Sequence, residues 1–274
     1  MITRSLDLDR PSDARVHDYF LGGGSNFAAD RALARRVLSA APDARIETLA
    51  HRACLGRMMR TCLDLGVRQF LDLGSGIPTA GSPHEIAAEA DPAARVVHVD
   101  NDQIAATQGQ LVLARCDNAA VLHADVRDPD SVLAAEQTRR LLDFQQPVAV
   151  LMFGVLHTFG EHHDPAQVIR RYTEAVAPGS FLALSHFTGE FAPERAREVL
   201  RVLDGSCPRP ALRDRETVRS FLDGLDLVDP GAVPAADWRP GPADADLRSP
   251  EPLGFALLAR TTPATRSRPD GASA

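Results

Sequence analysis

The stretch Phe70-Leu71-Asp72-Leu73-Gly74-Ser75-Gly76 decides the fold of this 274-residue chain. Its apolar first half is typical of a buried strand, which here ends in an acidic residue and passes into a glycine turn. Gly74 and Gly76 let the backbone bend sharply and let a ligand approach without a Cβ in the way. By itself this is a weak signal, because an ordinary tight turn between a strand and a helix has the same composition.

The segments around this stretch alternate between strand-like and helix-like patterns. Short apolar runs rich in Val, Leu and Phe follow at 94–100, 119–125, 148–156 and 180–187, and helical patterns precede them at 83–90, 102–115, 131–144 and 164–177. Strands spaced by helices indicate βαβ units and a parallel sheet. Apolar runs without polar alternation indicate that both faces of this sheet are buried.

The two ends of the chain complete the predicted fold. Residues 225–231 and 254–260 are expected to form two strands that close one sheet edge as an antiparallel hairpin. We therefore predict an α/β, Rossmann-like fold with a mostly parallel seven-stranded sheet and helices on both faces. Residues 1–65 are expected to form an N-terminal helical cap or lid, residues 66–262 the main domain, and residues 263–274 a disordered tail.

Two more apolar runs end in acidic residues, Asp100 and Asp125. A carboxylate only accepts hydrogen bonds, so Asp100 can accept from both hydroxyls of a ribose, whereas Asp102 fits better as the cap of the next helix. Asp125 can accept from an adenine amine while the Val126 N–H donates to a ring nitrogen. Ligands bind at the carboxyl edge of a parallel sheet, so three such strand ends together favour one adenosine-containing ligand.

A nicotinamide dinucleotide is the alternative ligand. Its fingerprint requires a third glycine at position 79, where this chain has Thr79. Asp72 would repel a pyrophosphate, whereas it would attract the positively charged end of an amino acid. Both features favour an adenosine ligand that carries an amino acid.

The overall charge also narrows the choice of partner. A net charge of −7 makes nucleic acid a poor candidate, because an acidic surface repels phosphate. The chain has no run of about 18 apolar residues, and its N-terminal sequence lacks an apolar signal core. We expect a cytoplasmic protein with no membrane partner and a small-molecule substrate.

The motifs at 70–76, 96–102 and 123–126 resemble those of class I S-adenosylmethionine-dependent methyltransferases. The N-terminal run 15–30 is more specific. Together with LDLGSGIPT at 71–79, it is similar to an actinobacterial family described as S-adenosyl methyltransferases, formerly a domain of unknown function. The resemblance spans nearly the whole chain. It implies S-adenosyl-L-methionine as the cofactor and leaves the methyl acceptor open.

The resemblance also implies a place for each part of the cofactor. Its methionine part would be lined by Asp72, Gly74, Ser75 and Gly76. Its ribose would be held by Asp100 and Asn101, and its adenine by Asp125 and Val126. Phe153, at the end of the fourth apolar run, would lie beneath the sulfonium.

A glycine-rich segment precedes the first strand. Three consecutive glycines at 22–24 interrupt a helical pattern, and Asn26 is expected to cap the helix that follows. One hypothesis is that this segment is a lid, in which His17, Tyr19, Gly23 and Asn26 contact the cofactor and Tyr19 faces the methyl group. The alternative is a packed structural turn with Tyr19 in the core.

Two histidines are candidates for a general base. His157 and His186 lie at the ends of the fourth and fifth apolar runs, near the expected acceptor pocket. Histidine titrates near neutral pH, although a lone histidine is more often structural. The run 161–164 (Glu-His-His-Asp) has the composition of a metal site, but adjacent ligands rarely share one ion and Asp164-Pro165 is typical of a helix start. We expect no metal.

The expected reaction is a direct displacement, in which a nucleophile attacks the activated methyl group and a neutral thioether leaves. Such chemistry requires mainly alignment of the reactants, and a base only if the nucleophile holds its proton. The fourth run lacks the Asn/Asp-Pro-Pro-aromatic sequence of amino-methylating DNA enzymes, which favours a small acceptor. Two alternatives stay open: a regulatory protein that binds the cofactor without transfer, and a nicotinamide-dependent dehydrogenase.

Overall fold

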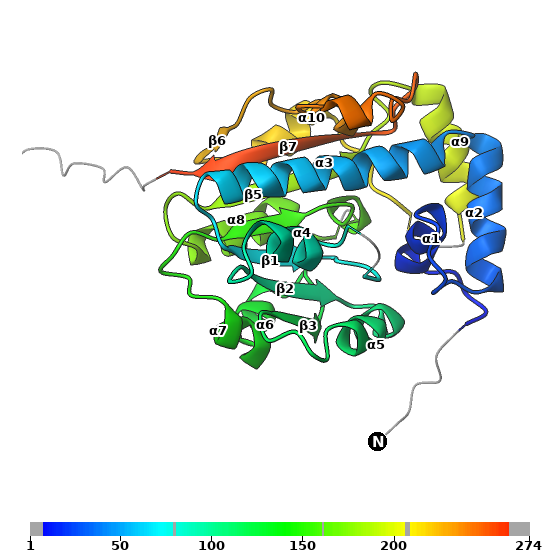
Figure 1. Cartoon of the computed structure of the whole chain (residues 1–274). Coiled ribbons are helices and arrows are strands. Elements are labelled where there is room, and N and C mark those ends of the chain that lie inside the picture. The colour runs from blue at the N-terminus through cyan, green and yellow to red at the C-terminus, as the bar shows by residue number, and fades with distance from the viewer. Residues whose placement is uncertain (1–7, 79–80, 161, 206–208, 263–274) are drawn as a thin grey trace, which may run out of the picture.

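The computed structural model describes residues 8–78, 81–160, 162–205 and 209–262. In that part of the chain, seven strands form one sheet in the order β3-β2-β1-β4-β5-β7-β6 (Figure 1). The strands are β1 (Gln69–Leu73), β2 (Arg95–Asp100), β3 (Ala119–His123), β4 (Ala149–Met152), β5 (Phe181–Phe187), β6 (Leu225–Leu227) and β7 (Gly254–Thr261). β1 to β5 run parallel, whereas β7 runs antiparallel to both of its neighbours, β5 and β6. The predicted mostly parallel sheet with an antiparallel edge hairpin is confirmed.

Helices cover both faces of the sheet, as expected. One face carries α3 (Ala44–Asp64), α4 (Pro83–Ala90) and α5 (Gln103–Val112). The other carries α6 (Pro129–Ala134), α7 (Glu136–Leu141), α8 (Pro165–Ala175) and α10 (Arg215–Ser220). Three short helices lie in the connections, namely η1 (Leu156–Thr158), η2 (Ala235–Asp237) and η3 (Pro242–Asp244). Each face of the sheet therefore has its own hydrophobic cluster.

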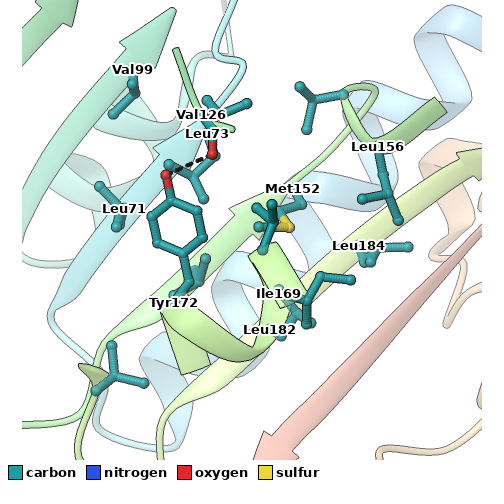
Figure 2. Packing of buried hydrophobic residues seen from close by; sticks show 14 of the residues in the cluster. Leu71, Leu73, Val99, Val126, Met152, Leu156, Ile169, Tyr172, Leu182 and Leu184 are labelled. Carbon is teal, nitrogen blue, oxygen red and sulfur yellow. Dashed lines mark hydrogen bonds between the residues drawn. The ribbon is translucent and has the colours of Figure 1, made fainter. Parts of the chain in front are cut away.

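Tyr172 of α8 shows how one of these faces is closed. Val168, Ile169 and Tyr172 are buried at helical spacing, so one side of the helix faces the sheet. In Figure 2 the Tyr172 ring lies among strand residues of the cluster, such as Leu71. Its hydroxyl donates a 2.9 Å hydrogen bond to the carbonyl of Val126. The core therefore also fixes the loop that follows β3.

The helical pattern at 131–144 forms two helices rather than one. Ala135 has a ψ of 145° and interrupts the pattern between α6 and α7. α6 contacts α8, whereas α7 contacts β2 and β3. The extended backbone at Ala135 therefore separates two helices that pack against different elements.

The N-terminal helices gather at one end of the molecule. α1 (Asp13–Phe20) and α2 (Ala28–Ala40) share an apolar cluster with α9 (Pro193–Leu203) (Figure 1). α3, by contrast, packs directly on the sheet. The boundary at residue 65 stays a prediction, and this packing favours a cap made of α1 and α2. The tail expected at 263–274 lies outside the described residues.

Within the described ranges, no helix is long and apolar enough to cross a bilayer. The longest helix, α3, carries charged side chains along its length, such as Arg52, Arg57 and Arg60.

Candidate functional site

The ends of β1 and β2 meet at the carboxylate of Asp100. This carboxylate accepts a 2.7 Å hydrogen bond from the Gly76 N–H and a 2.8 Å hydrogen bond from the Asp102 N–H. The residue is 8% exposed, and burial raises the pKa of its carboxyl to about 6, although the two backbone bonds lower it. Each oxygen keeps a further lone pair, so Asp100 can hold the glycine turn and still accept from a ligand.

The glycine turn after β1 has a closed side and an open side. At Gly74, φ is +74° and an added Cβ would lie 2.6 Å from the Cβ of Val155, in the loop after β4. Gly74 and Ser75 also donate their N–H groups to the Val99 carbonyl, at 2.8 and 3.1 Å. At Gly76, φ is +65° and an added Cβ would meet nothing within 4 Å. The turn is therefore fixed against β2 and β4, while its backbone at Gly76 leaves space for a ligand.

Asp72, the acidic end of β1, takes part in a buried chain of hydrogen bonds. His98 Nδ1 of β2 donates to its carboxylate at 2.8 Å, and His98 Nε2 lies 3.2 Å from His84 Nδ1 of α4. Burial lowers the pKa of His84, as does the neighbouring His98. Sequence reasoning missed both histidines. His98 could have been found, because it lies two residues before Asp100 and therefore on the same face of β2.

The loop after β2 contacts the N-terminal segment. Asp102 accepts hydrogen bonds from the N–H groups of Ile104 and Ala105, at 2.8 and 3.1 Å, which confirms it as the cap of α5. The Ser12 hydroxyl donates to the other oxygen of Asp102 at 2.5 Å. Asn101 is exposed, and its carbonyl lies 3.1 Å from His123 Nε2. The segment ahead of α1 therefore reaches the predicted ribose site.

The loop after β3 leaves the backbone N–H of Val126 without a partner among the described residues. The carboxylate of Asp125 forms a 2.5 Å ion pair with Arg127, and this hydrogen-bonded pair holds the pKa of Asp125 below its usual value. The side chain of Val126 is buried, and its carbonyl accepts the Tyr172 hydroxyl. The Val126 N–H has no hydrogen-bond partner among the described residues. It is therefore available for the acceptor that the sequence assigned to it, a ring nitrogen.

The three glycines after α1 form a turn around Asp18. The carboxylate of this buried residue accepts from the Ser25 N–H at 2.9 Å and from Asn26 Nδ2 at 2.8 Å. A Cβ on Gly23 would lie 1.9 Å from Asp18 Oδ1. Gly23 and Asn26 therefore pack against Asp18 within the segment, as the alternative of a packed structural turn predicts. Sequence reasoning missed Asp18, because no local pattern shows that its side chain folds back on the turn.

The expected role of Asn26 as a helix cap is wrong. α2 begins after Phe27, whose N–H is bound by the carboxylate of Asp30 at 2.8 Å. Asn26 donates to Asp18 instead, and its own oxygen lies 3.2 Å from Arg31 Nη1. Phe27 therefore stands at the N-cap position, and the buried carboxylate of Asp30, the third residue of the helix, binds its N–H while it also pairs with Arg15.

His17 and Tyr19 diverge from the same helix. Tyr19 packs against the apolar cluster of the cap, with its ring 6.1 Å from that of Phe20. The ring of His17 lies 6.4 Å from that of His51 in α3. Of the two, His17 is the one that faces the carboxyl edge of the sheet.

His51 links α3 to the ends of β4 and β5. Its ring lies 4.7 Å from the ring of Phe153, and its Nε2 lies 2.6 Å from Ser185 Oγ. Ser185 Oγ also accepts the Gly154 N–H at 2.8 Å. Burial is the main reason why the pKa values of His17 and His51 fall to about 3, and the charge of Arg52 lowers both further. Neither His51 nor Ser185 was predicted, because each is an isolated polar residue within an amphipathic or apolar run.

His157 and His186, the two predicted bases, lie together. Their rings are 6.5 Å apart and nearly parallel. His186 is 2% exposed, and its Nδ1 has no hydrogen-bond partner among the described residues. Burial lowers the pKa of His186 to about 3, followed by the charges of His157 and Arg213, and burial also lowers the pKa of His157. These two histidines, like His17 and His51, are therefore neutral at physiological pH.

Two residues of the acidic and histidine-rich run at 161–164 have contacts that do not involve a metal. Asp164 caps α8 by accepting from the Gln167 N–H at 3.0 Å, and His163 Nε2 lies 3.0 Å from Arg127. Glu161 and Thr79 lie outside the described residues. Within the described ranges, no group of three His, Cys, Asp or Glu side chains is arranged to hold a metal ion.

Known proteins resemble this chain along nearly its whole length. A model of the family described as S-adenosyl methyltransferase matches residues 1–262. The crystal structure of a DUF574 family protein from Streptomyces avermitilis is 34% identical, and the match covers 94% of this chain and 100% of that one with a TM-score of 0.89. A candidate methyltransferase from Thermobifida fusca is 37% identical, with 96% and 99% covered and a TM-score of 0.88.

More distant structures share the fold alone. The plantazolicin methyltransferase BpumL, solved in complex with a triazolic desmethylPZN analog and SAH, is 8% identical. Its match covers 91% of this chain and 96% of that one, with a TM-score of 0.52. No curated protein matches the chain.

Proposed function

Because this chain belongs to the S-adenosyl methyltransferase family, we propose that it methylates a small-molecule acceptor at the carboxyl edge of its sheet. Family membership makes the protein an S-adenosylmethionine-dependent methyltransferase. Family membership therefore excludes the dehydrogenase that the sequence had left as an alternative. The residues that hold the cofactor, and the class of acceptor, are our proposal.

The observation that carries the proposal is the contact between Asp100 and Gly76. It places a buried carboxylate beside an open stretch of backbone, where an adenosine ligand needs an acceptor for its ribose hydroxyls and room for its sugar. Asn101 would add to the ribose site. Asp72, Gly74, Ser75 and Gly76 would line the methionine part, and Asp125 and Val126 would hold the adenine. When bound, the cofactor supplies a methyl group activated by a sulfonium.

The acceptor site in this proposal lies over β4 and β5. Phe153 and His51 form its floor, with His17 on the side of the cap and His157 on the other side. Burial lowers the pKa of His157, so its imidazole is a weak base that removes a proton only from an acidic group. We therefore favour an acceptor whose nucleophilic atom is acidic or carries no proton. His157 is the better placed base, because His186 is almost completely buried.

The N-terminal segment forms one wall of the acceptor site in this proposal. His17 provides the contact, while Asp18, Gly23 and Asn26 hold the turn behind it. Tyr19, which packs in the cap, would support the wall rather than face the methyl group. The contact of Ser12 with Asp102 would keep this wall next to the ribose site.

We also propose a cytoplasmic location. The described cysteines Cys54, Cys62 and Cys116 are free thiols, and burial raises the pKa of Cys54 and Cys62 to about 12. Inert reduced thiols suit a reducing compartment. Cell fractionation with an antibody to the full chain would test this, and recovery from the secreted fraction would contradict it.

Ligand binding tests the cofactor site directly. Titration calorimetry of the full chain with S-adenosylhomocysteine should show saturable binding, and NAD should show none. Asp100→Ala should weaken S-adenosylhomocysteine by about tenfold or more, because it removes charge-assisted hydrogen bonds to the ribose. Binding of NAD without S-adenosylhomocysteine would overturn the proposal.

Labelled cofactor tests the acceptor class. The protein and methyl-labelled S-adenosylmethionine are incubated with cell extract separated into small molecules, protein and nucleic acid. Label should move to the small-molecule fraction with the wild-type protein and more slowly with Asp100→Ala. Transfer to protein or nucleic acid alone would refute a small-molecule acceptor.

A further inference from the structure

Arg52 is a half-buried cation with no ion-pair partner among the described residues. It lies in α3, next to His51, and forms no hydrogen bond or ion pair with any side chain or carbonyl that the structure describes. Arg57, on the same helix, shows the usual alternative: it pairs with Asp244 at 3.1 Å and donates to the carbonyls of Trp238 and Ala235. Arg52 has lost part of its hydration without gaining a paired carboxylate, so its guanidinium can bind an anionic partner.

The position of Arg52 indicates where that partner would lie. Its stem passes over the loop between β1 and α4, since a Cβ on Gly81 would lie 3.9 Å from its Cγ and 4.0 Å from its Cδ. Burial lowers the pKa of Arg52 more than the charges of Asp72 and Glu85 raise it. The charges of both carboxylates stabilise the charged form of Arg52, but by less than the lost hydration destabilises it.

Each of these two carboxylates already accepts a hydrogen bond from another group. Asp72 accepts from His98, and Glu85 accepts from the Gly81 N–H at 2.7 Å. Arg52 of α3 and Asp72 of β1 therefore place a positive group and a negative group near each other at the loop after β1. This is the charge pattern that recognises a zwitterionic amino acid, which carries a carboxylate and an ammonium on one carbon.

We propose that Arg52 binds the carboxylate of the cofactor's methionine part, with Asp72 facing its ammonium. The inference rests on the proposed function and adds a residue to it. A carboxylate of the acceptor is the other possible source of the anion. The cofactor is favoured because Arg52 lies over the β1 loop, whereas the acceptor site lies toward Ser185 of β5, on the side that His51 contacts. A guanidinium also suits a carboxylate because it can donate two parallel hydrogen bonds.

The experiment compares two ligands that differ only in this carboxylate. S-adenosylhomocysteine has it, and its decarboxylated form keeps the ammonium and the adenosine. Affinities of both are measured by titration calorimetry for the wild-type chain, Arg52→Gln and Arg52→Lys. Arg60→Gln is the matched control, because Arg60 is an exposed arginine of the same helix. Thermal melting checks that each variant is folded.

Arg52→Gln should weaken S-adenosylhomocysteine by about ten- to a hundredfold, the loss expected for hydrogen bonds between charged groups. It should leave the decarboxylated ligand within about twofold of its wild-type affinity. Arg52→Lys should recover part of the loss, and Arg60→Gln should change neither ligand.

Two results would overturn the assignment. An equal loss for both ligands would mean that Arg52 has a structural role. No loss for either ligand would mean that Arg52 does not bind the cofactor, which leaves a carboxylate of the acceptor as its anion. Failure of the wild-type protein to bind either ligand would instead count against the proposed cofactor site. The two inferences therefore fail in distinguishable ways.

Discussion

Replacing Asp100 with asparagine should change how the stability of the protein depends on pH. The carboxyl is buried, and its pKa is about 6 in the folded protein against an ordinary value of 3.8. A folded-state pKa above the unfolded one means that folding favours the protonated form. Its contribution to stability is therefore fully present below the unfolded pKa and is lost as the pH rises through 6.

The magnitude follows from the two pKa values. Well above both of them, the penalty is about 3 kcal/mol, since one pKa unit corresponds to about 1.4 kcal/mol. Between about pH 4 and about pH 8, the wild-type protein should lose roughly 2 kcal/mol from this group alone. Asparagine has no charge to bury, but its amide N–H₂ would face one of the two backbone donors, Gly76 or Asp102. That mismatch costs about 1–3 kcal/mol at every pH.

Asp100→Asn should therefore be less stable than the wild-type protein near pH 4 and equally stable, or up to about 2 kcal/mol more stable, near pH 8. Urea unfolding followed by circular dichroism across this range gives the difference at each pH. Asp91→Asn is a control of opposite sign, because hydrogen bonds from the Ala93 N–H and Arg68 lower the pKa of Asp91. The reasoning is refuted if the stability curves of Asp100→Asn and the wild-type protein run parallel over the whole range.

Three more results are expected. The affinity for S-adenosylhomocysteine should fall as the pH drops below about 6, by up to about tenfold per unit, because protonated Asp100 accepts fewer hydrogen bonds; calorimetry measures it. Gly74→Ala should lower the melting temperature more than Gly76→Ala, because both positions have positive φ but only Gly74 faces Val155. Asp18→Ala should speed amide exchange between residues 15 and 28 without loosening the sheet, and bound S-adenosylhomocysteine should slow exchange there in the wild-type protein.

Each of these has a result that contradicts it. A pH-independent affinity would remove Asp100 from the ribose site. Equal melting temperatures for the two alanine variants would mean that the loop at Val155 moves aside at little cost. Exchange at 15–28 that is already slow and indifferent to ligand would make this segment a fixed part of the scaffold.

The sheet and its acidic strand ends were predictable because each leaves a local pattern. Apolar runs at regular spacing give the strands, and the carboxyl edge follows from their parallel direction. The helical cap expected at 1–65 includes α3, but the sequence pattern does not choose the buried side of this helix: Ile46 and Leu49 are 37% and 38% exposed, whereas Cys62 is fully buried. The side of α3 that is buried depends on how the helix packs on the sheet, and the sequence of the helix alone does not contain that information.

The parts of the site that escaped prediction are pairings between distant residues. Asp72 meets His98 because β1 and β2 are neighbours in register, and His51 meets Ser185 because α3 crosses β5. Such contacts depend on the packing angle and the register, and no spacing along the chain encodes them. Arg52 was missed for the same reason: its distinguishing feature is the absence of a partner among the described residues.

The place of β7 in the sheet affects how the protein is made on the ribosome. β7 inserts between β5 and β6, so Phe187 pairs with Gly254, far along the chain. Translation adds about 5–20 residues per second, so the backbone of β5 waits on the order of several seconds for its neighbour. During that time the nascent chain exposes an unpaired strand edge, which invites pairing with other chains. The growing polypeptide should therefore be most vulnerable to aggregation, and most in need of a chaperone, between the synthesis of β5 and the emergence of β7.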